Sequence, residues 1–262
     1  MFRFLLSRQW VILTLVAVAL VPTMIELGFW QLHRHEHRVA LNRVIADSLA
    51  ARPVPAETLT SPGAEVDGED RYRRVTATGR FDTAREVVVR RRTNADDKVG
   101  FHVLTPFVLD DGKILLVNRG WIPADGAQTE FPEIPAPPKG EVTVTGRLMP
   151  DETTADSGIK DRAGLPDRQV MLINSEQAER RLGTPVLGGY VDLTSPEPRA
   201  GSPELIPAPD HDDIGPHLAY AVQWWLFCVG VPVGWVVLVR RELRDRREAR
   251  SAEGAAKEPA PV

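Results

Sequence analysis

The sequence predicts a membrane protein of the α+β class, in which two transmembrane helices flank a mostly antiparallel β domain, barrel-like or sandwich, with one short helix. Three observations predict this. Two long stretches, one near each end of the chain, are almost free of charged side chains. Between them, apolar and polar side chains alternate as they do on strands, and one helical pattern interrupts the alternation. The 262 residues are otherwise of ordinary globular composition, 43% apolar and 26% charged.

The first apolar stretch, residues 10–29, is predicted to be transmembrane helix 1. Twenty residues at about 1.5 Å each span the ~30 Å hydrocarbon core of a bilayer. A cleaved signal peptide is the alternative, because Arg3 and Arg8 precede the stretch and Ala17-Val18-Ala19 resembles a cleavage site. The stretch stays apolar from Leu20 to Ile25, past that site, which favours the membrane helix.

Residues 30–52 are predicted to extend this helix beyond the membrane until Pro53 stops it. The apolar side chains here keep helical spacing: Leu41, Val44, Ile45 and Leu49.

Residues 53–216 are predicted to form an extracytoplasmic β-rich domain. Asp111-Gly112 between two apolar runs indicates a hairpin, and the one helix, Ser175 to Leu182, has Asn174 or Ser175 as its cap. Too few helices are present for many parallel crossovers, so the pairing should be mostly antiparallel. The strands are expected within 74–81, 86–91, 99–109, 113–118, 141–148, 168–173 and 185–193. The long Pro-rich connections are 123–139, 150–167 and 195–209.

Residues 218–239 carry no charge and are predicted to be transmembrane helix 2. Bases precede the first span and follow the second, so the flanking charges place both termini, 1–9 and 240–262, in the cytoplasm. The tail 240–262 is basic, with seven bases against five acids, and is predicted to be disordered. The predicted location is a cell membrane crossed twice, a bacterial plasma membrane in preference to the mitochondrial inner membrane.

Composition narrows the possible functions. Of the net charge of −4, the part between the two basic ends carries −8, which argues against a nucleic-acid partner. The one cysteine, Cys228, lies in the second span, so no internal disulfide or CxxC site can form. The sequence has no nucleophile elbow, P-loop, dinucleotide-binding glycine motif or zinc signature, so we expect that the protein is not an enzyme.

Three local features stand above this background. His33, His35 and His37 follow the first span, and two of them at i and i+4 could share a metal, although interfacial residues are the plainer interpretation. Arg119, before Gly120 and Trp121 at the end of a strand, is either a packing residue or a carboxylate-binding one.

The third feature is His217 at the outer end of the second span, with Tyr220 and Trp224 at i+3 and i+7. An aromatic belt explains the two rings. His217 is also able to offer an imidazole nitrogen to a metal at the membrane surface.

Taken together, the motifs resemble the surfeit locus protein 1 family of cytochrome c oxidase assembly factors, from the first span to the last. Arg38 stands where that family often has lysine, and the triple histidine run is not part of its pattern. The matching segments are Leu27-Gly28-x-Trp30-Gln31-Leu32-x-Arg34; Tyr72, Val75 and Gly79-x-Phe81; Gly100-Phe101-x-Val103-x-Thr105-Pro106-Phe107; Val117-Asn118-Arg119-Gly120-Trp121-Ile122-Pro123; Gly146-Arg147; and His217-Leu218-x-Tyr220-Ala221-x-Gln223-Trp224.

The resemblance implies a role in building a haem–copper oxidase, through supply or insertion of haem a into the catalytic subunit. The family histidine linked to haem a binding corresponds to His217, the expected axial ligand of a transiently bound haem iron. Arg34, Arg38 and Arg119 are then expected to hold the propionates. Trp30, Tyr220 and Trp224 would form apolar walls. Expected partners are the oxidase catalytic subunit, haem a synthase and membrane lipid.

Three other functions stay open. A haem-free membrane scaffold that stabilises the nascent oxidase subunit would share these features except the dependence on His217. A ligand sensor would need an output domain, for which the tail after Arg240 is short. A membrane hydrolase would need a nucleophile and a base, which the sequence does not display.

Overall fold

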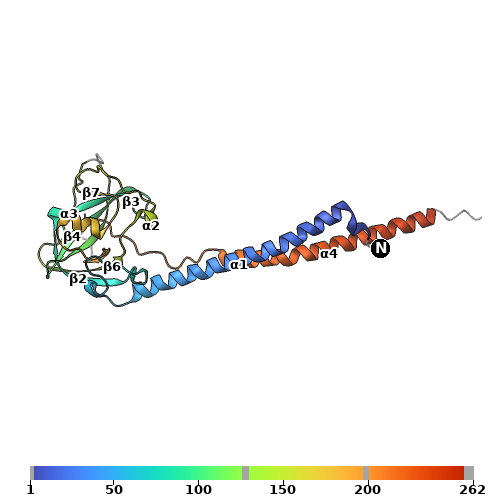
Figure 1. Cartoon of the computed structure of the whole chain (residues 1–262), viewed down its shortest axis with the longest axis horizontal. Helices are drawn as coiled ribbons and strands as arrows, with labels where there is room; N and C mark the ends of the chain where they lie inside the picture. The colour runs from blue at the N-terminus through green and yellow to red at the C-terminus, as the bar shows by residue number, and fades with distance from the viewer. Residues whose placement is uncertain (1–2, 126–129, 197–200, 257–262) are drawn as a thin grey trace, which may run out of the picture. The chain divides into compact units, whose positions relative to one another are not determined.

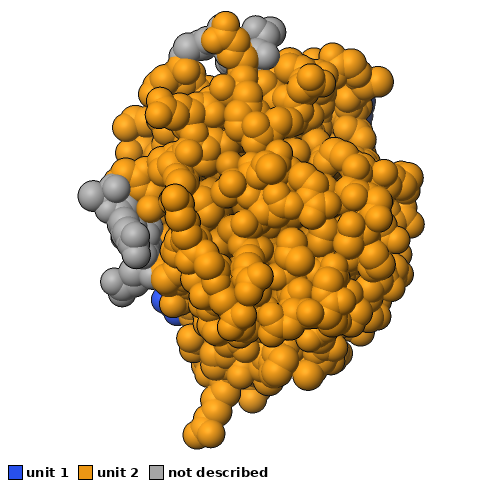
Figure 2. Space-filling model, turned by 90° about the vertical axis from the view of Figure 1, so that its left-hand side faces the viewer, with its two compact units in different colours: residues 1–42, 212–262 blue, residues 43–211 orange. Residues whose placement is uncertain are grey.

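The computed structural model describes residues 3–125, 130–196 and 201–256 (Figure 1). The chain forms two compact units. The first consists of Met1–Asn42 and Asp212–Val262, and the second of Arg43–His211 (Figure 2). The fold therefore has an α part made of both chain ends and a β part made of the middle.

Two long helices make up the first unit, together with the short 3₁₀ helix η1 (Arg3–Leu6). α1 (Arg8–Ala50) begins in this unit, and α4 (His217–Ala256) runs beside it (Figure 1). The Trp235 indole donates to the Thr14 hydroxyl over 3.1 Å, and the rings of Phe29 and Trp225 meet edge to face with centroids 5.7 Å apart. Both helices are long and apolar enough to cross a membrane.

The two helices extend beyond the apolar stretches. α1 includes the predicted span 10–29 and continues through the predicted extension as far as Ala50, three residues before Pro53. α4 continues to Ala256, whereas the sequence predicts disorder over 240–262; residues 257–262 lie outside the described part. Arg and Glu are good helix formers, and the Arg246 side chain pairs with Glu242 one turn earlier at 2.6 Å, which favours continued helix.

Within the described residues, the second unit holds one eight-stranded sheet, with the strand order β1-β2-β6-β8-β5-β4-β3-β7. Its strands are β1 (Val54–Pro55), β2 (Arg74–Phe81), β3 (Val87–Thr93), β4 (Val99–Leu109), β5 (Ile114–Pro123), β6 (Val142–Met149), β7 (Gln169–Val170) and β8 (Tyr190–Ser195). Its short helices are η2 (Ala56–Thr58), η3 (Gly68–Asp70), η4 (Thr83–Arg85), α2 (Thr154–Ser157) and α3 (Ser175–Leu182).

The long strands pair mostly antiparallel, and β2 pairs with β4 as well as with β6. The hydrogen-bond ladder β2–β6–β8–β5–β4 thus returns to its first strand. The parallel pairs β1–β2, β3–β7 and β5–β8 are only two residues long each. The choice between barrel and sandwich stays a prediction.

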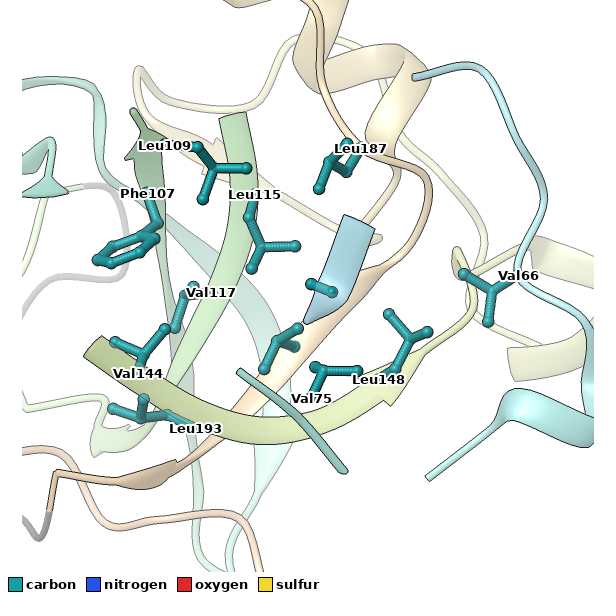
Figure 3. Packing of buried hydrophobic residues seen from close by; sticks show 12 residues of the cluster. Val66, Val75, Phe107, Leu109, Leu115, Val117, Val144, Leu148, Leu187 and Leu193 are labelled. Atoms are coloured by element: carbon teal, nitrogen blue, oxygen red, sulfur yellow. The ribbon is translucent and has the colours of Figure 1, made fainter. Parts of the chain in front are cut away.

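The main core of this unit lies against the concave side of β6 and its neighbours. Figure 3 shows its apolar side chains pointing toward one another from β2, β4, β5, β6 and β8. Phe107, Leu115, Val117 and Leu148 have no exposed surface. At about 25 cal/mol per Å² of buried apolar area, this packing is the main stabilising contribution that a unit without disulfides has available.

Most predicted elements appear with small shifts of their ends. The predicted strand 99–109 matches β4, and α3 has the predicted bounds, with the Asn174 side chain accepting from the backbone N–H of Gln177. The Asp111-Gly112 turn joins β4 to β5, and Gly112 has φ of +85°. The predicted strand 168–173 shortens to the two residues of β7, and α2 was not predicted.

Candidate functional site

A groove in the first unit brings most of the predicted site residues together. It has a volume of about 760 Å³, which lies within the ~300–1,000 Å³ range of ligand and cofactor sites. α1 supplies one wall, and the segment leading into α4 supplies the other. The lining residues are Trp30, His33, Arg34, His37, Arg38, Leu41, Asp213, Ile214, Gly215, Pro216 and His217.

His217 is the first residue of α4 and is partly buried. Its Nδ1 lies 3.0 Å from Oε1 of Gln31 on α1. A carbonyl oxygen only accepts, so with Oε1 as the partner Nδ1 would carry the imidazole proton and Nε2 would have a free electron pair. No hydrogen bond of Nε2 is found within the described part of the chain.

The rim of the groove is the segment Asp213–Pro216, and α1 holds it in place. Arg38 Nε and Asn42 Nδ2 both donate to the backbone carbonyl of Asp213, over 3.1 and 3.0 Å. Gly215 turns the chain into the helix with φ of +64°, a conformation that disfavours other residues. A Cβ at this position would lie 3.4 Å from Nε2 of His217, so glycine also leaves space at that nitrogen.

Cations and one flat ring line the opposite wall. The Arg34 guanidinium lies over the Trp30 ring, 5.6 Å from the ring centroid. The two residues are one helical turn apart on α1. Arg38 follows one turn later. Trp30 is 53% exposed, so its ring has a face left for a ligand. The groove therefore combines two guanidinium groups, an indole and three imidazoles.

The histidine run contributes two side chains to the groove, His33 and His37. No group of three or more His, Cys, Asp or Glu side chains that could hold a metal ion occurs in the described residues. His35 lies outside the groove lining, and its buried Nδ1 has no partner among the residues described. The run thus adds polar groups to the groove.

The two other aromatic residues predicted for the site do not line the groove. Tyr220 is 46% exposed on α4, and Trp224 contacts Phe227 edge to face with centroids 6.2 Å apart. Trp225 faces α1 instead, since a Cβ on Gly28 would meet its ring at 2.2 Å.

Arg119 lies in β5 of the second unit, where its side chain is 5% exposed. Its Nη1 donates to Glu86 Oε2 over 2.7 Å and its Nη2 to the Pro135 carbonyl over 2.5 Å. Burial lowers the pKa of Arg119 from its ordinary value, and the Glu86 carboxylate opposes that shift. Within this unit, the guanidinium already holds a carboxylate. Trp121 is likewise a packing residue, 8% exposed, with its indole N–H donated to the Arg92 carbonyl.

A second polar cluster lies among the strands of the second unit. Asn118 donates to Asp192 Oδ1 over 2.7 Å, and its Nδ2 also lies 3.4 Å from His102 Nδ1. Burial raises the pKa of Asp192 to about 6, partly offset by Arg147 and the Asn118 hydrogen bond. Burial and the charge of Arg92 lower the pKa of His102 to about 3. Asn118 and Asp192 are buried among the strands, so we expect this cluster to affect stability.

The sequence motifs did not single out Gln31, Asn42 and the rim as functional. Gln31 stands beside Trp30 in the motif, which is a weak signal, and the other two become meaningful only once α1 and the rim lie together. Chemically, the groove offers imidazole nitrogens beside guanidinium groups suited to carboxylates. It suits a flat, acidic, metal-bearing ligand.

Comparisons with known proteins cover nearly the whole chain. The model of the SURF1 family matches residues 18–229. An uncharacterised SURF1-like protein of Mycobacterium tuberculosis is 34% identical over 264 residues, which cover 99% of this chain and 94% of that protein. A SURF1-like protein of Rickettsia conorii is 26% identical, covering 83% and 87%. Surfeit locus protein 1 of Takifugu rubripes is 30% identical over 150 residues, 51% and 60% of the two chains. The chain therefore belongs to the SURF1 family, known generally as a cytochrome c oxidase assembly family.

Proposed function

We propose that this protein assists the assembly of a haem–copper cytochrome c oxidase by holding haem a in the groove of the first unit and passing it to the catalytic subunit. The observation that carries the proposal is His217. Its Nδ1 contacts Gln31 and its Nε2 is left for a metal, in a groove that Arg34 and Arg38 also line. Histidine is the commonest protein ligand of haem iron, and arginine suits the propionates.

The residues present fit such a cargo by their chemistry. Trp30 supplies an apolar ring face, and the groove opens beside helices apolar enough to lie in lipid. A bound haem would supply the iron and the two propionates that this set of side chains is suited to hold. His217 is the imidazole assigned to the iron in this proposal, and a partner that brings a stronger ligand could then take the cargo. Arg119 is left out of this proposal, because Glu86 already occupies its guanidinium.

The proposal includes the orientation of the protein in the membrane. Both helices cross the cell membrane, with the termini in the cytoplasm and the β-rich unit outside. Bases follow the apolar part of α4 at Arg240, Arg241 and Arg244, as expected for a cytoplasmic end. The catalytic subunit and haem a synthase would meet the protein from within the same membrane.

The decisive experiment is an absorption spectrum. The full chain is purified in mild detergent from cells that make haem a, beside His217→Ala and the matched control His33→Ala, which removes another groove imidazole. We expect a haem band in the native protein and in His33→Ala, and its loss in His217→Ala. Arg34→Ala and Arg38→Ala should retain less haem because propionate contacts are lost.

Two results would overturn the proposal. If His217→Ala carries the same band as the native protein, the ligand assignment is wrong. If no version carries haem, yet deleting the protein still reduces oxidase assembly, the haem-free scaffold is the better description.

A further inference from the structure

We infer that Gln31 is a positioning residue for His217: it fixes the imidazole tautomer so that Nε2 stays unprotonated toward the groove. This inference rests on the proposed function for its use, though its geometry stands without it. Gln31 and His217 are 186 positions apart in the chain, and their side chains meet at 3.0 Å. Neither the helix pattern of α1 nor that of α4 alone predicts this contact.

The orientation of the Gln31 amide decides which ring nitrogen of His217 carries the proton. With Oε1 toward Nδ1, the imidazole must donate, so Nδ1 carries the proton and Nε2 is a ligand nitrogen. With the amide turned over, its NH₂ would donate to Nδ1, and Nε2 would carry the proton and could not bind a metal. The tautomer of His217 therefore tests the inference directly.

Close packing of α1 against α4 keeps Gln31 and His217 within hydrogen-bonding distance. Gly28, one turn before Gln31, allows the Trp225 ring against α1. Ala221, one turn after His217, has no exposed surface. Small residues at such positions let two membrane helices approach closely. The approach explains why a side chain as short as glutamine reaches the histidine.

The other edge of the imidazole faces the rim. Gly215 leaves space at Nε2, where a Cβ would lie 3.4 Å away. The bonds from Arg38 and Asn42 to the Asp213 carbonyl hold this rim segment. One imidazole nitrogen is thus bound to α1 and the other borders the groove.

The choice of an amide suits a protein that must release its cargo. Partners of metal-binding histidines are often carboxylates, which make the ligand more basic and the metal bond stronger. A neutral amide fixes the tautomer with less added basicity. Gln31→Glu should therefore keep the tautomer and hold haem more tightly, whereas Gln31→Leu should lose the fixed tautomer.

The first test needs no haem. The full chain, labelled with ¹⁵N-histidine, is studied by NMR in detergent at about pH 9, well above the ordinary imidazole pKa of about 6.5. His217→Ala assigns the signal. We expect the Nδ1–H tautomer in the native protein and in Gln31→Glu, and a loss of this preference in Gln31→Leu. An Nε2–H tautomer in the native protein would refute the inference.

The second test measures haem affinity by absorption titration. Gln31→Leu should weaken binding about 10-fold or more, the usual effect of losing a partner of a ligating histidine. Gln9→Leu, a glutamine near the other end of the apolar part of α1, should bind as the native protein does. If the tautomer depends on Gln31 but no haem binds, the proposed function fails and the positioning role stands. If haem binding needs His217 but neither tautomer nor affinity responds to Gln31, only the positioning role fails.

Discussion

Arg119 and Glu86 form an ion pair that is almost removed from water, with side chains 5% and 6% exposed. Truncating one partner leaves the other as an unpaired buried charge, so we expect Arg119→Met to lower the free energy of unfolding by about 3–5 kcal/mol. Urea unfolding of the full chain in detergent, followed by tryptophan fluorescence, measures this change.

Two further variants make that result interpretable. Arg80→Ala breaks an exposed pair with Glu141, 71% and 57% exposed, and should cost less than about 1 kcal/mol. Arg119→Met combined with Glu86→Leu removes both charges and should recover part of the loss. A cost for Arg119→Met as small as that of the surface variant would mean that the pair is hydrated in solution.

Asp192 and His102 should make opposite contributions to the pH dependence of stability. The pKa of Asp192 is raised to about 6 in the fold, so its contribution is present below its ordinary value of 3.8 and is lost as pH rises toward 6. The pKa of His102 is lowered to about 3, so its contribution is present above 6.5 and is lost as pH falls toward 3. Between about pH 4 and 6 the two slopes oppose each other.

Single substitutions should separate the two contributions to the pH dependence of the free energy of unfolding. In Asp192→Asn, the free energy of unfolding should fall by up to about 1.4 kcal/mol for each pH unit between pH 6 and 4, because Asp192 then no longer opposes His102. In His102→Gln, it should rise over the same range. Urea unfolding at pH 4.5, 5.2 and 6.0 (about equal steps of the range) gives both slopes. Parallel curves for the two variants would contradict the assignment.

At the scale of the element, α3 depends on Asn174, the residue that caps its N-terminus. The Asn174 side chain accepts from the Gln177 N–H over 2.9 Å, and Gly183 ends the helix with φ of +65°. We expect Asn174→Ala to lower the free energy of unfolding by about 1 kcal/mol, and Asn174→Asp to retain it. Equal losses in the two variants would mean that the amide matters for another reason.

Elements with local signals could be predicted from the sequence. The strand 99–109 is a mostly apolar run rich in valine and phenylalanine, Asp111-Gly112 is a typical hairpin turn, and α3 follows a capping residue, so all three are found where they were predicted. The strand β1 was not predicted, and β7 is shorter than the predicted strand 168–173, because each of these two-residue strands exists only through a parallel partner elsewhere in the sheet. Local periodicity holds no information about such pairing.

The candidate site was likewise predictable only where local sequence motifs mark its residues. Trp30, Arg34, Arg38 and His217 could be predicted from motifs, and they line one groove. Gln31 could not, because its role arises from the register of α1 against α4. The family resemblance implies that Arg119 binds a ligand, whereas in the structure its guanidinium pairs with Glu86, 33 residues earlier in the chain. Burial of that pair depends on the whole sheet.

For the whole molecule, we predict that the two ends of the chain and the β-rich unit lie on opposite sides of the membrane. Cys228 is the only thiol, so Cys228→Ala gives a thiol-free background. In that background, a membrane-impermeant maleimide should label Ser61→Cys in intact spheroplasts and should label Ser251→Cys only after permeabilisation. Both side chains are exposed in the structure. Labelling of both sites in intact spheroplasts would refute this topology.

The backbone carbonyl of Asp213 holds the rim of the groove through two side chains of α1. Its two hydrogen bonds, from Arg38 and Asn42, connect the rim to α1. At about 1 kcal/mol net for each bond, the two contacts together contribute about 2 kcal/mol to holding the rim against α1. Under the proposed function, a ligand that enters or leaves beneath the rim has to replace this contribution with contacts of its own.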